Sequence, residues 1–83
     1  MGDYYICSFQ YDDPSLMAYL HSVIVVPGYA GVDITPYKLP MTFECYAEAA
    51  AMIAFVASCV DSEIAQGLFI RKRETKEEND NGI

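Results

Sequence analysis

The sequence predicts a small α+β domain in which two helices lie on one face of an antiparallel sheet of three to four strands. Residues 45–60 are rich in alanine and contain no glycine or proline, which favours a helix. Residues 4–10 combine aromatic and β-branched side chains, a composition typical of a strand. Residues 14–22 follow an Asp-Pro pair of the kind that begins helices, and they carry apolar residues four apart. With 83 residues, the chain is long enough for one domain with a small core.

The helix predicted over residues 45–60 has more apolar surface than a helix lying on one sheet needs. The stripe expected to face the sheet consists of Ala50, Ile53, Ala54, Ala57 and Val60. Met52, Phe55 and Val56 fall partly outside this stripe, and they are candidate self-association residues because a large exposed apolar patch usually marks an interaction site. The alternative is that the first helix and a loop cover them. At about 16 residues the run is shorter than the about 20 that a membrane span needs.

The N-terminal part predicts a strand followed by a helix. Residues 4–10 are apolar on both faces, which suits a central strand. The helix over residues 14–22 begins at an Asp13 N-cap and places Leu16 and Leu20 on one face. The β-branched residues 23–26 either continue this helix or start a strand, and a loop over residues 28–31 follows.

Before the long helix, the sequence predicts two short extended segments, over residues 32–35 and 39–44. Residues 35–38 between them form either a hairpin turn or one helical turn, and Pro40 confines the second segment to an edge or a strand start. Residues 63–73 predict the last strand, with Gly67 as a candidate bulge. The resulting β-α-β-β-α-β order is the ferredoxin-like arrangement. If the prolines break the middle pair, a three-stranded sheet is the alternative.

Charge divides the chain into an acidic domain and a mixed tail. Residues 1–70 hold eight acidic residues against Lys38 alone, a net charge of −7. Arg71, Lys72 and Arg73 then add +3, and the tail over residues 74–83 contributes −3. The predicted domain therefore spans residues 1–73, and the tail, with almost no apolar groups, is expected to be mobile. An acidic domain repels nucleic acid and anionic membranes, and its field attracts basic partners.

No motif indicates catalysis, a metal ion or a cofactor. The single histidine, His21, is separated from the three cysteines by gaps that match no zinc pattern. Cys7, Cys45 and Cys59 lie in apolar surroundings and are expected to be packed, without the basic neighbours that activate a thiol. An odd number of scattered cysteines and an N-terminus without a signal-peptide pattern predict a cytoplasmic protein. The protein is expected not to be an enzyme.

RNA binding on an open sheet face is a further hypothesis that the aromatic residues suggest. Tyr4, Tyr5, Phe9 and Phe69 are aromatic residues of predicted strands, and such rings stack bases in several RNA-binding folds. Phosphate binding needs basic side chains, however, and the domain offers only Lys38 before the terminal triplet. The charge therefore disfavours direct nucleic-acid binding.

The sequence thus predicts a non-enzymatic, acidic protein-binding module that occupies a basic, nucleic-acid-binding surface of a partner protein. Small acidic proteins of phages and mobile elements, including inhibitors of CRISPR complexes, are similar in size and charge, although no motif is shared. In this hypothesis carboxylates imitate phosphates and tyrosines imitate bases, and the candidate contact residues are Tyr11, Asp12, Asp13, Tyr29, Asp33 and Tyr37. The alternative is a dimeric, small-ligand-binding or regulatory ferredoxin-like domain in which Met52, Phe55 and Val56 form the subunit contact.

Overall fold

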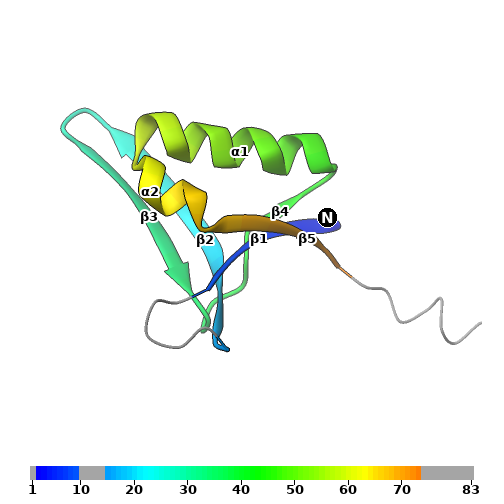
Figure 1. Cartoon of the computed structure of the whole chain (residues 1–83). Helices are drawn as coiled ribbons and strands as arrows, with labels where there is room; N and C mark the ends of the chain where they lie inside the picture. The colour runs from blue at the N-terminus through cyan, green and yellow to red at the C-terminus, as the bar shows by residue number, and fades with distance from the viewer. Residues whose placement is uncertain (1, 10–14, 74–83) are drawn as a thin grey trace, which may run out of the picture.

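The computed structural model describes residues 2–9 and 15–73, and within them the predicted α+β class is confirmed. An antiparallel five-stranded sheet carries both helices on one face (Figure 1). The elements follow in the order β1 (Tyr4–Phe9), β2 (Met17–Val26), β3 (Tyr29–Thr35), β4 (Thr42–Phe43), α1 (Tyr46–Cys59), α2 (Ser62–Gln66) and β5 (Leu68–Lys72). The strands precede the two helices as a block, so the order is not the ferredoxin-like one that the sequence predicted.

The prediction of a helix over residues 14–22 is wrong, because residues 17–26 form strand β2. Ala18 and Leu20 are buried and alternate with partly exposed neighbours, which is the two-residue period of a strand. An apolar spacing of four residues satisfies this period as well as the helical one. The β-branched run from Val23 to Val26 favours extended backbone, and pairing of residues 17–26 with β1 and β3 decides for the strand. The predicted N-cap Asp13 lies outside the described residues.

Strand β1 is central, as the sequence predicted. Along one edge it pairs with β5 from Tyr4 to Ser8. β2 and β4 share its other edge: β2 pairs with Cys7 to Phe9, and β4 pairs with Tyr4 and Tyr5. The Met41 N–H donates to the Leu20 carbonyl at 2.9 Å and joins the start of β4 to β2. The segment predicted over residues 39–44 is thus reduced to a two-residue strand that begins shortly after Pro40.

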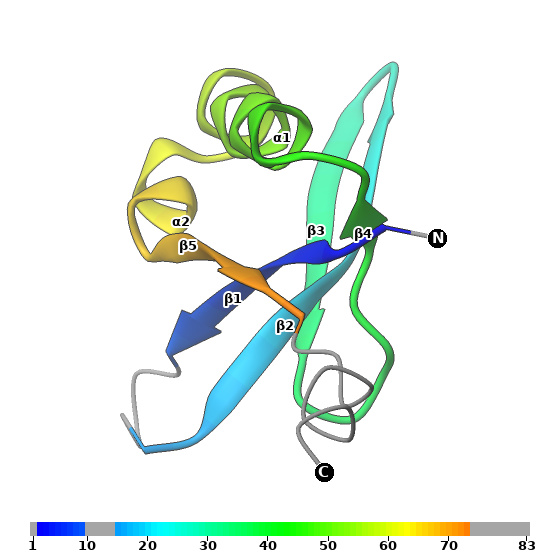
Figure 2. The ribbon, with the colours of Figure 1, turned by 90° about the vertical axis from the view of Figure 1, so that its right-hand side faces the viewer.

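Beyond Tyr19, β2 leaves β1 and forms a hairpin with β3 that rises past α1 (Figure 2). A register shift between Leu20 and Ser22 changes which side chains face the helices, so that Val23 and not Ser22 packs against the core. The turn consists of Pro27 and Gly28 only. The predicted loop over residues 28–31 is therefore wrong, because β3 already starts at Tyr29.

Helix α1 lies over the sheet and supplies much of the core. Ala49 and Val56 are fully buried, and Met52, Ile53 and Ala57 pack partly buried beside them. Ile53 and Ala57 thus face the sheet as predicted, whereas placing Val56 and Met52 on the outside is wrong. The reason is that α2 with Ala65 and β4 with Phe43 contribute to the same core, so the buried face of α1 is wider than one stripe facing a sheet. Ala50, Ala54 and Phe55 lie on the exposed side. The fully or nearly buried core cluster is Ile6, Leu20, Ala49, Val56, Ala65 and Leu68.

The C-terminal segment contains a short helix that the sequence did not predict. The Asp61 carboxylate accepts hydrogen bonds from the N–H groups of Glu63 and Ile64, at 2.8 and 3.3 Å, and so caps the start of α2. Residues 62–66 are therefore helical, and the last strand begins at Leu68 and not at residue 63. Gly67 is not a bulge; it lies at the end of α2, with a φ of −89° that any residue adopts.

Candidate binding site on the open face of the sheet

The side of the sheet turned away from both helices is rich in aromatic side chains. Residues directly opposite each other in a sheet share a face. Cys7 pairs with Tyr19 on one side and with Phe69 on the other, and Phe9 pairs with Met17. We define the open face as the surface formed by Tyr5, Cys7, Phe9, Met17, Tyr19, Phe69 and Arg71. Neither helix covers it (Figure 1).

Two pairs of aromatic rings organise the open face. Tyr5 and Tyr19 meet edge to face, with ring centroids 5.8 Å apart. Phe9 and Phe69 are stacked at 5.3 Å, and Phe9 remains exposed. Aromatic pairs in these arrangements contribute about 0.5–1.5 kcal/mol beyond the area that they bury. They therefore hold in place an apolar surface that neither helix covers.

Cys7 lies at the centre of this face and is fully buried. Its position between the two ring pairs follows from the strand register, in which Tyr19 and Phe69 are its cross-strand neighbours. Burial raises the pKa of the Cys7 thiol, and the smaller opposing effect comes from the Arg71 guanidinium. Cys7 is thus a packed neutral thiol, as predicted. The same prediction is wrong for Cys45 and Cys59, which are exposed.

Beside the Tyr5–Tyr19 pair, the chain forms a hollow of about 740 Å³. Tyrosine, proline and leucine side chains provide most of its walls, and two basic residues complete them. The lining residues are Tyr5, Tyr19, Pro36, Tyr37, Lys38, Leu39, Pro40 and Arg73. This volume lies within the range of small-molecule pockets, and the hollow is open to solvent. The hollow is therefore the candidate binding site.

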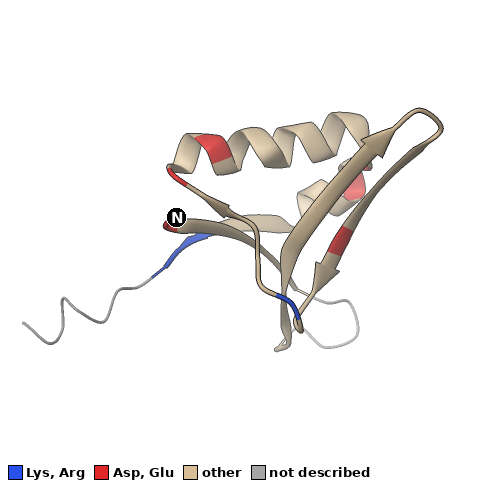
Figure 3. Ribbon diagram, turned by 180° about the vertical axis from the view of Figure 1, so that it is seen from behind, with Lys and Arg blue, Asp and Glu red and all other residues tan. Residues whose placement is uncertain are grey.

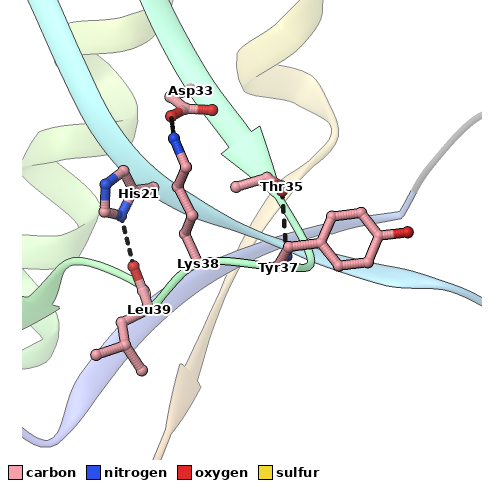
Figure 4. A network of polar contacts seen from close by, with 6 residues as sticks. All are labelled: His21, Asp33, Thr35, Tyr37, Lys38 and Leu39. Carbon is pink, nitrogen blue, oxygen red and sulfur yellow. Dashed lines mark hydrogen bonds and ion pairs between the residues drawn. The ribbon is translucent and has the colours of Figure 1, made fainter.

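The loop before β4 builds one wall of the hollow and is anchored along its length (Figure 4). The Tyr37 N–H donates to the Thr35 hydroxyl at 3.1 Å. This segment is therefore an ST-turn, closed by the threonine side chain, and not a helical turn. His21 Nδ1 lies 2.7 Å from the Leu39 carbonyl, which can only accept, so this nitrogen carries the hydrogen. Lys38 Nζ lies 3.1 Å from the Asp33 carboxylate.

Charges are distributed unevenly between the two sides of the molecule, although Asp33 lies beside Lys38 on the side of the hollow. Of the basic residues in the described ranges, Lys38 and Arg73 line the hollow and Arg71 lies on the open face. Lys72 belongs to the other side, with Nζ 5.8 Å from the centre of the Tyr4 ring. The acidic residues of the helix layer are Glu44, Glu48, Asp61 and Glu63, all of them exposed (Figure 3). A chain with a net charge of −7 therefore presents its described cations mainly around one aromatic surface.

The structure brings together few of the residues that the sequence singled out for partner binding. Tyr11, Asp12 and Asp13 lie outside the described residues. Tyr29 is at the tip of the hairpin, away from the hollow, while Tyr37 lines the hollow and Asp33 reaches it only through Lys38. Of the self-association candidates, Val56 is fully buried, Met52 is half-buried and Phe55 is 41% exposed.

Sequence reasoning missed Tyr19 and Arg73 as parts of a site. Tyr19 was placed in a helix, although it alternates with the buried Ala18 and Leu20 and so could have been assigned to the opposite face of a strand. Arg73 entered the sequence analysis only through its charge. Its backbone N–H donates to the Asp3 carbonyl, which extends the pairing of β5 with β1 and fixes Arg73 beside the hollow.

The described residues contain no group of three or more His, Cys, Asp or Glu side chains that could hold a metal ion. Within the same ranges, neither helix has the length and apolar character needed to cross a membrane. Comparison with protein-family models, with curated proteins and with solved structures found no match to this chain. Its function is therefore inferred from the geometry of the open face.

Proposed function

We propose that this protein is a non-enzymatic binding module whose hollow and open face bind an extended, acidic segment of a partner protein. The observation that supports the proposal is the hollow itself, which combines three tyrosines and two prolines with Lys38 and Arg73 on a sheet face that neither helix covers.

The aromatic and proline side chains suit an extended peptide. Grooves lined with aromatic rings recognise extended, proline-containing segments, because such segments lose little conformational entropy on binding. Tyrosine offers a rigid apolar ring and a hydroxyl that can hydrogen-bond to a peptide backbone. Tyr37 is available for this role because its side chain is 87% exposed, and Figure 4 shows the ring pointing away from the Asp33–Lys38 pair.

The basic residues favour an acidic segment. Arg71 belongs to β5, Arg73 follows two residues later, and Lys38 and Arg73 both line the hollow. The ion pair of Lys38 with Asp33 is exposed on both sides, at 57% and 40%, and such pairs contribute only about 0–1 kcal/mol. A carboxylate of a bound segment can therefore compete for Lys38 at little cost.

A nucleic acid is a less suitable occupant of the same surface. Single-stranded nucleic acid also stacks on aromatic rings, but its affinity depends on neutralising several phosphates. The few cations around the hollow belong to a chain whose net charge is −7, and this overall field opposes a polyanion. A short acidic peptide carries fewer charges, so local complementarity outweighs the repulsion.

The basic partner predicted from the sequence would contact Tyr11, Asp12, Asp13, Tyr29, Asp33 and Tyr37, and the helix layer offers such a partner a second acidic surface. Glu44, Glu48, Asp61 and Glu63 are exposed on the helix layer, on the side of the molecule opposite the hollow. That hypothesis and the present proposal therefore differ in the sign of the partner's charge, and one experiment separates them.

The test is fluorescence anisotropy with extended, proline-containing peptides that are identical except for glutamate, glutamine or lysine at the charged positions. We expect the glutamate set to bind, and Tyr37→Ala and Arg73→Gln each to weaken binding about tenfold, the cost of losing a contact worth about 1.4 kcal/mol. Lys72→Gln is the matched control, because it removes the same charge one residue away on the other side of the sheet.

Four outcomes would overturn the proposal. Preference for the lysine set would support a basic partner, and tighter binding of an oligonucleotide than of any peptide would assign the face to nucleic acid. A thermal shift with metabolites, but with none of the peptides, would support a small-ligand domain. Glutamate peptides that bind equally to wild type, Tyr37→Ala and Arg73→Gln would place the peptide site elsewhere.

A further inference from the structure

We infer that two copies of this protein associate through the outer edge of β3, forming one continuous sheet across a two-fold axis. This inference is independent of the proposed peptide site, because β3 is the outer strand of the hairpin and none of its residues line the hollow.

The first observation is that β3 has a free edge. Within the described residues, β2 is the only strand that pairs with β3. No other backbone hydrogen bond in these ranges involves residues 29–35. A strand of seven residues therefore presents outward-pointing N–H and C=O groups, and such an edge is a template for another strand.

The second observation is that this edge lacks protection. Isolated edges are usually blocked by lysine or proline, but β3, with the sequence YAGVDIT, contains neither. Its only charged residue is Asp33, and the ion pair with Lys38 neutralises it. The edge of β3 therefore has no residue that would prevent another strand from pairing with it.

The third observation is the exposed apolar surface of the hairpin that β3 borders. Ile24, Val25, Val26 and Tyr29 are between 46% and 61% exposed. Figures 1 and 2 show this end of the hairpin projecting beside the end of α1. The Tyr29 ring lies along its own strand over Gly31, where an added Cβ would be 2.5 Å from the Tyr29 hydroxyl oxygen. The ring thus covers β3 at Gly31.

The strand is also complementary to itself. In an antiparallel pair with its two-fold axis at Val32, this residue lies opposite its own copy, and Ala30 lies opposite Ile34. These side chains are on the face that packs against the core, as the position of Val32 and Ile34 beside the core cluster shows. On the other face Asp33 lies opposite Gly31, so like charges do not meet. Such a contact is isologous, as a closed dimer requires.

The test uses the full chain in analytical ultracentrifugation across micromolar to millimolar concentrations. We expect a monomer–dimer equilibrium that Ala30→Lys, which places a charge on the edge, shifts to monomer. Ile24→Lys puts the same charge on β2 of the same hairpin and serves as the control, with circular dichroism confirming that both variants are folded. A chain that is monomeric at every concentration would overturn the inference, as would a dimer that Ala30→Lys leaves unchanged.

Cross-linking tests the position of the axis. In an antiparallel pair, the Cα atoms of opposed residues are about 4.5–5.5 Å apart, which lies within the range that a disulfide spans. In a background with Cys45→Ser and Cys59→Ser, Val32→Cys should therefore form a covalent dimer on mild oxidation. Val23→Cys, opposite Val32 on β2 and one strand further from the axis, should not. Equal cross-linking of the two variants, or cross-linking of Val23→Cys alone, would contradict the proposed register.

Discussion

At the residue scale, burial separates side chains that look alike in the sequence. Cys7 is enclosed by the aromatic pairs of the open face, whereas Cys45 and Cys59 are exposed. We expect Cys45 and Cys59 to react rapidly with a thiol reagent in native buffer, and the third thiol to react only when the chain opens or unfolds. Counting thiols with and without denaturant checks this. Three thiols reacting at one rate in native buffer would show that the open face does not protect Cys7.

The raised pKa of Cys7 also makes stability depend on pH. The folded protein favours the neutral form of this thiol, and this preference adds to the free energy of unfolding. The contribution of Cys7 is fully present below the unfolded pKa of about 8.5 and is lost as the pH rises through the higher folded pKa. The free energy of unfolding of the wild type should therefore be lower at alkaline pH than at neutral pH. Cys7→Ala should lose less between the same two pH values, although it is less stable at neutral pH. Urea titrations at neutral and alkaline pH measure both quantities.

Val56 and Phe55 provide a second comparison between neighbouring residues. Val56 is fully buried in the core cluster, while Phe55 is 41% exposed. We expect Val56→Ala to lower the free energy of unfolding by about 2 kcal/mol, because two buried methyl groups are removed and a cavity remains. Phe55→Ala should cost less in spite of its larger side chain. The opposite order in urea denaturation would mean that α1 presents its other side to the sheet.

At the element scale, the hairpin turn depends on one glycine. Pro27 fixes a negative φ and Gly28 has a φ of +85°, the combination of a type II turn, in which the third position favours glycine. An added Cβ at Gly28 would meet no atom within 4 Å, so Gly28→Ala isolates the backbone effect. We expect a loss of about 1–2 kcal/mol. Gly67→Ala is the control, since its φ is negative and its nearest contacts, at 3.7 and 3.8 Å, are ordinary.

Elements whose character is set locally were predicted correctly, and those that depend on partners were not. The alanines of α1 and the aromatic residues of β1 determine their own conformations, so both elements lie close to their predicted bounds. Residues 17–26 have apolar spacing that fits a helix or a strand, and pairing with both β1 and β3 decides the outcome. The predicted inward face of α1 was partly wrong, because both Ala50 and Val56 are apolar and hydropathy alone does not show that Val56 is buried and Ala50 exposed.

At the scale of the whole molecule, the candidate site was not predictable because its parts are distant in the sequence. Tyr5, Tyr19, Tyr37 and Arg73 come from β1, β2, the loop before β4 and the residue after β5. Only the topology, in which β2 and β4 share one edge of β1, brings that loop across the sheet to Tyr5 and Tyr19. Net charge gave the opposite expectation for the partner, because a sum over the chain does not show that the cations gather on one side.

The two hypotheses about the partner predict opposite changes in binding affinity when Asp33 is replaced by Asn. If acidic side chains imitate phosphate toward a basic partner, Asp33→Asn removes a contact and weakens binding. If the hollow binds an acidic segment, the same change frees Lys38 from its only ion-pair partner that the structure describes, and glutamate peptides should bind more tightly. The gain is limited to about two- to fivefold, since an exposed pair contributes about 0.2–1 kcal/mol.

Glu63→Gln is the control for this experiment, because it makes the same change in net charge on α2, on the other side of the molecule. Anisotropy titrations of wild type, Asp33→Asn and Glu63→Gln should be made at low and at physiological salt, since screening reduces any effect of net charge alone. A gain in affinity that both variants share and that salt removes would be a long-range field effect. A gain confined to Asp33→Asn requires a peptide carboxylate near Lys38, whereas weaker glutamate-peptide binding in Asp33→Asn would exclude Lys38 as part of the site.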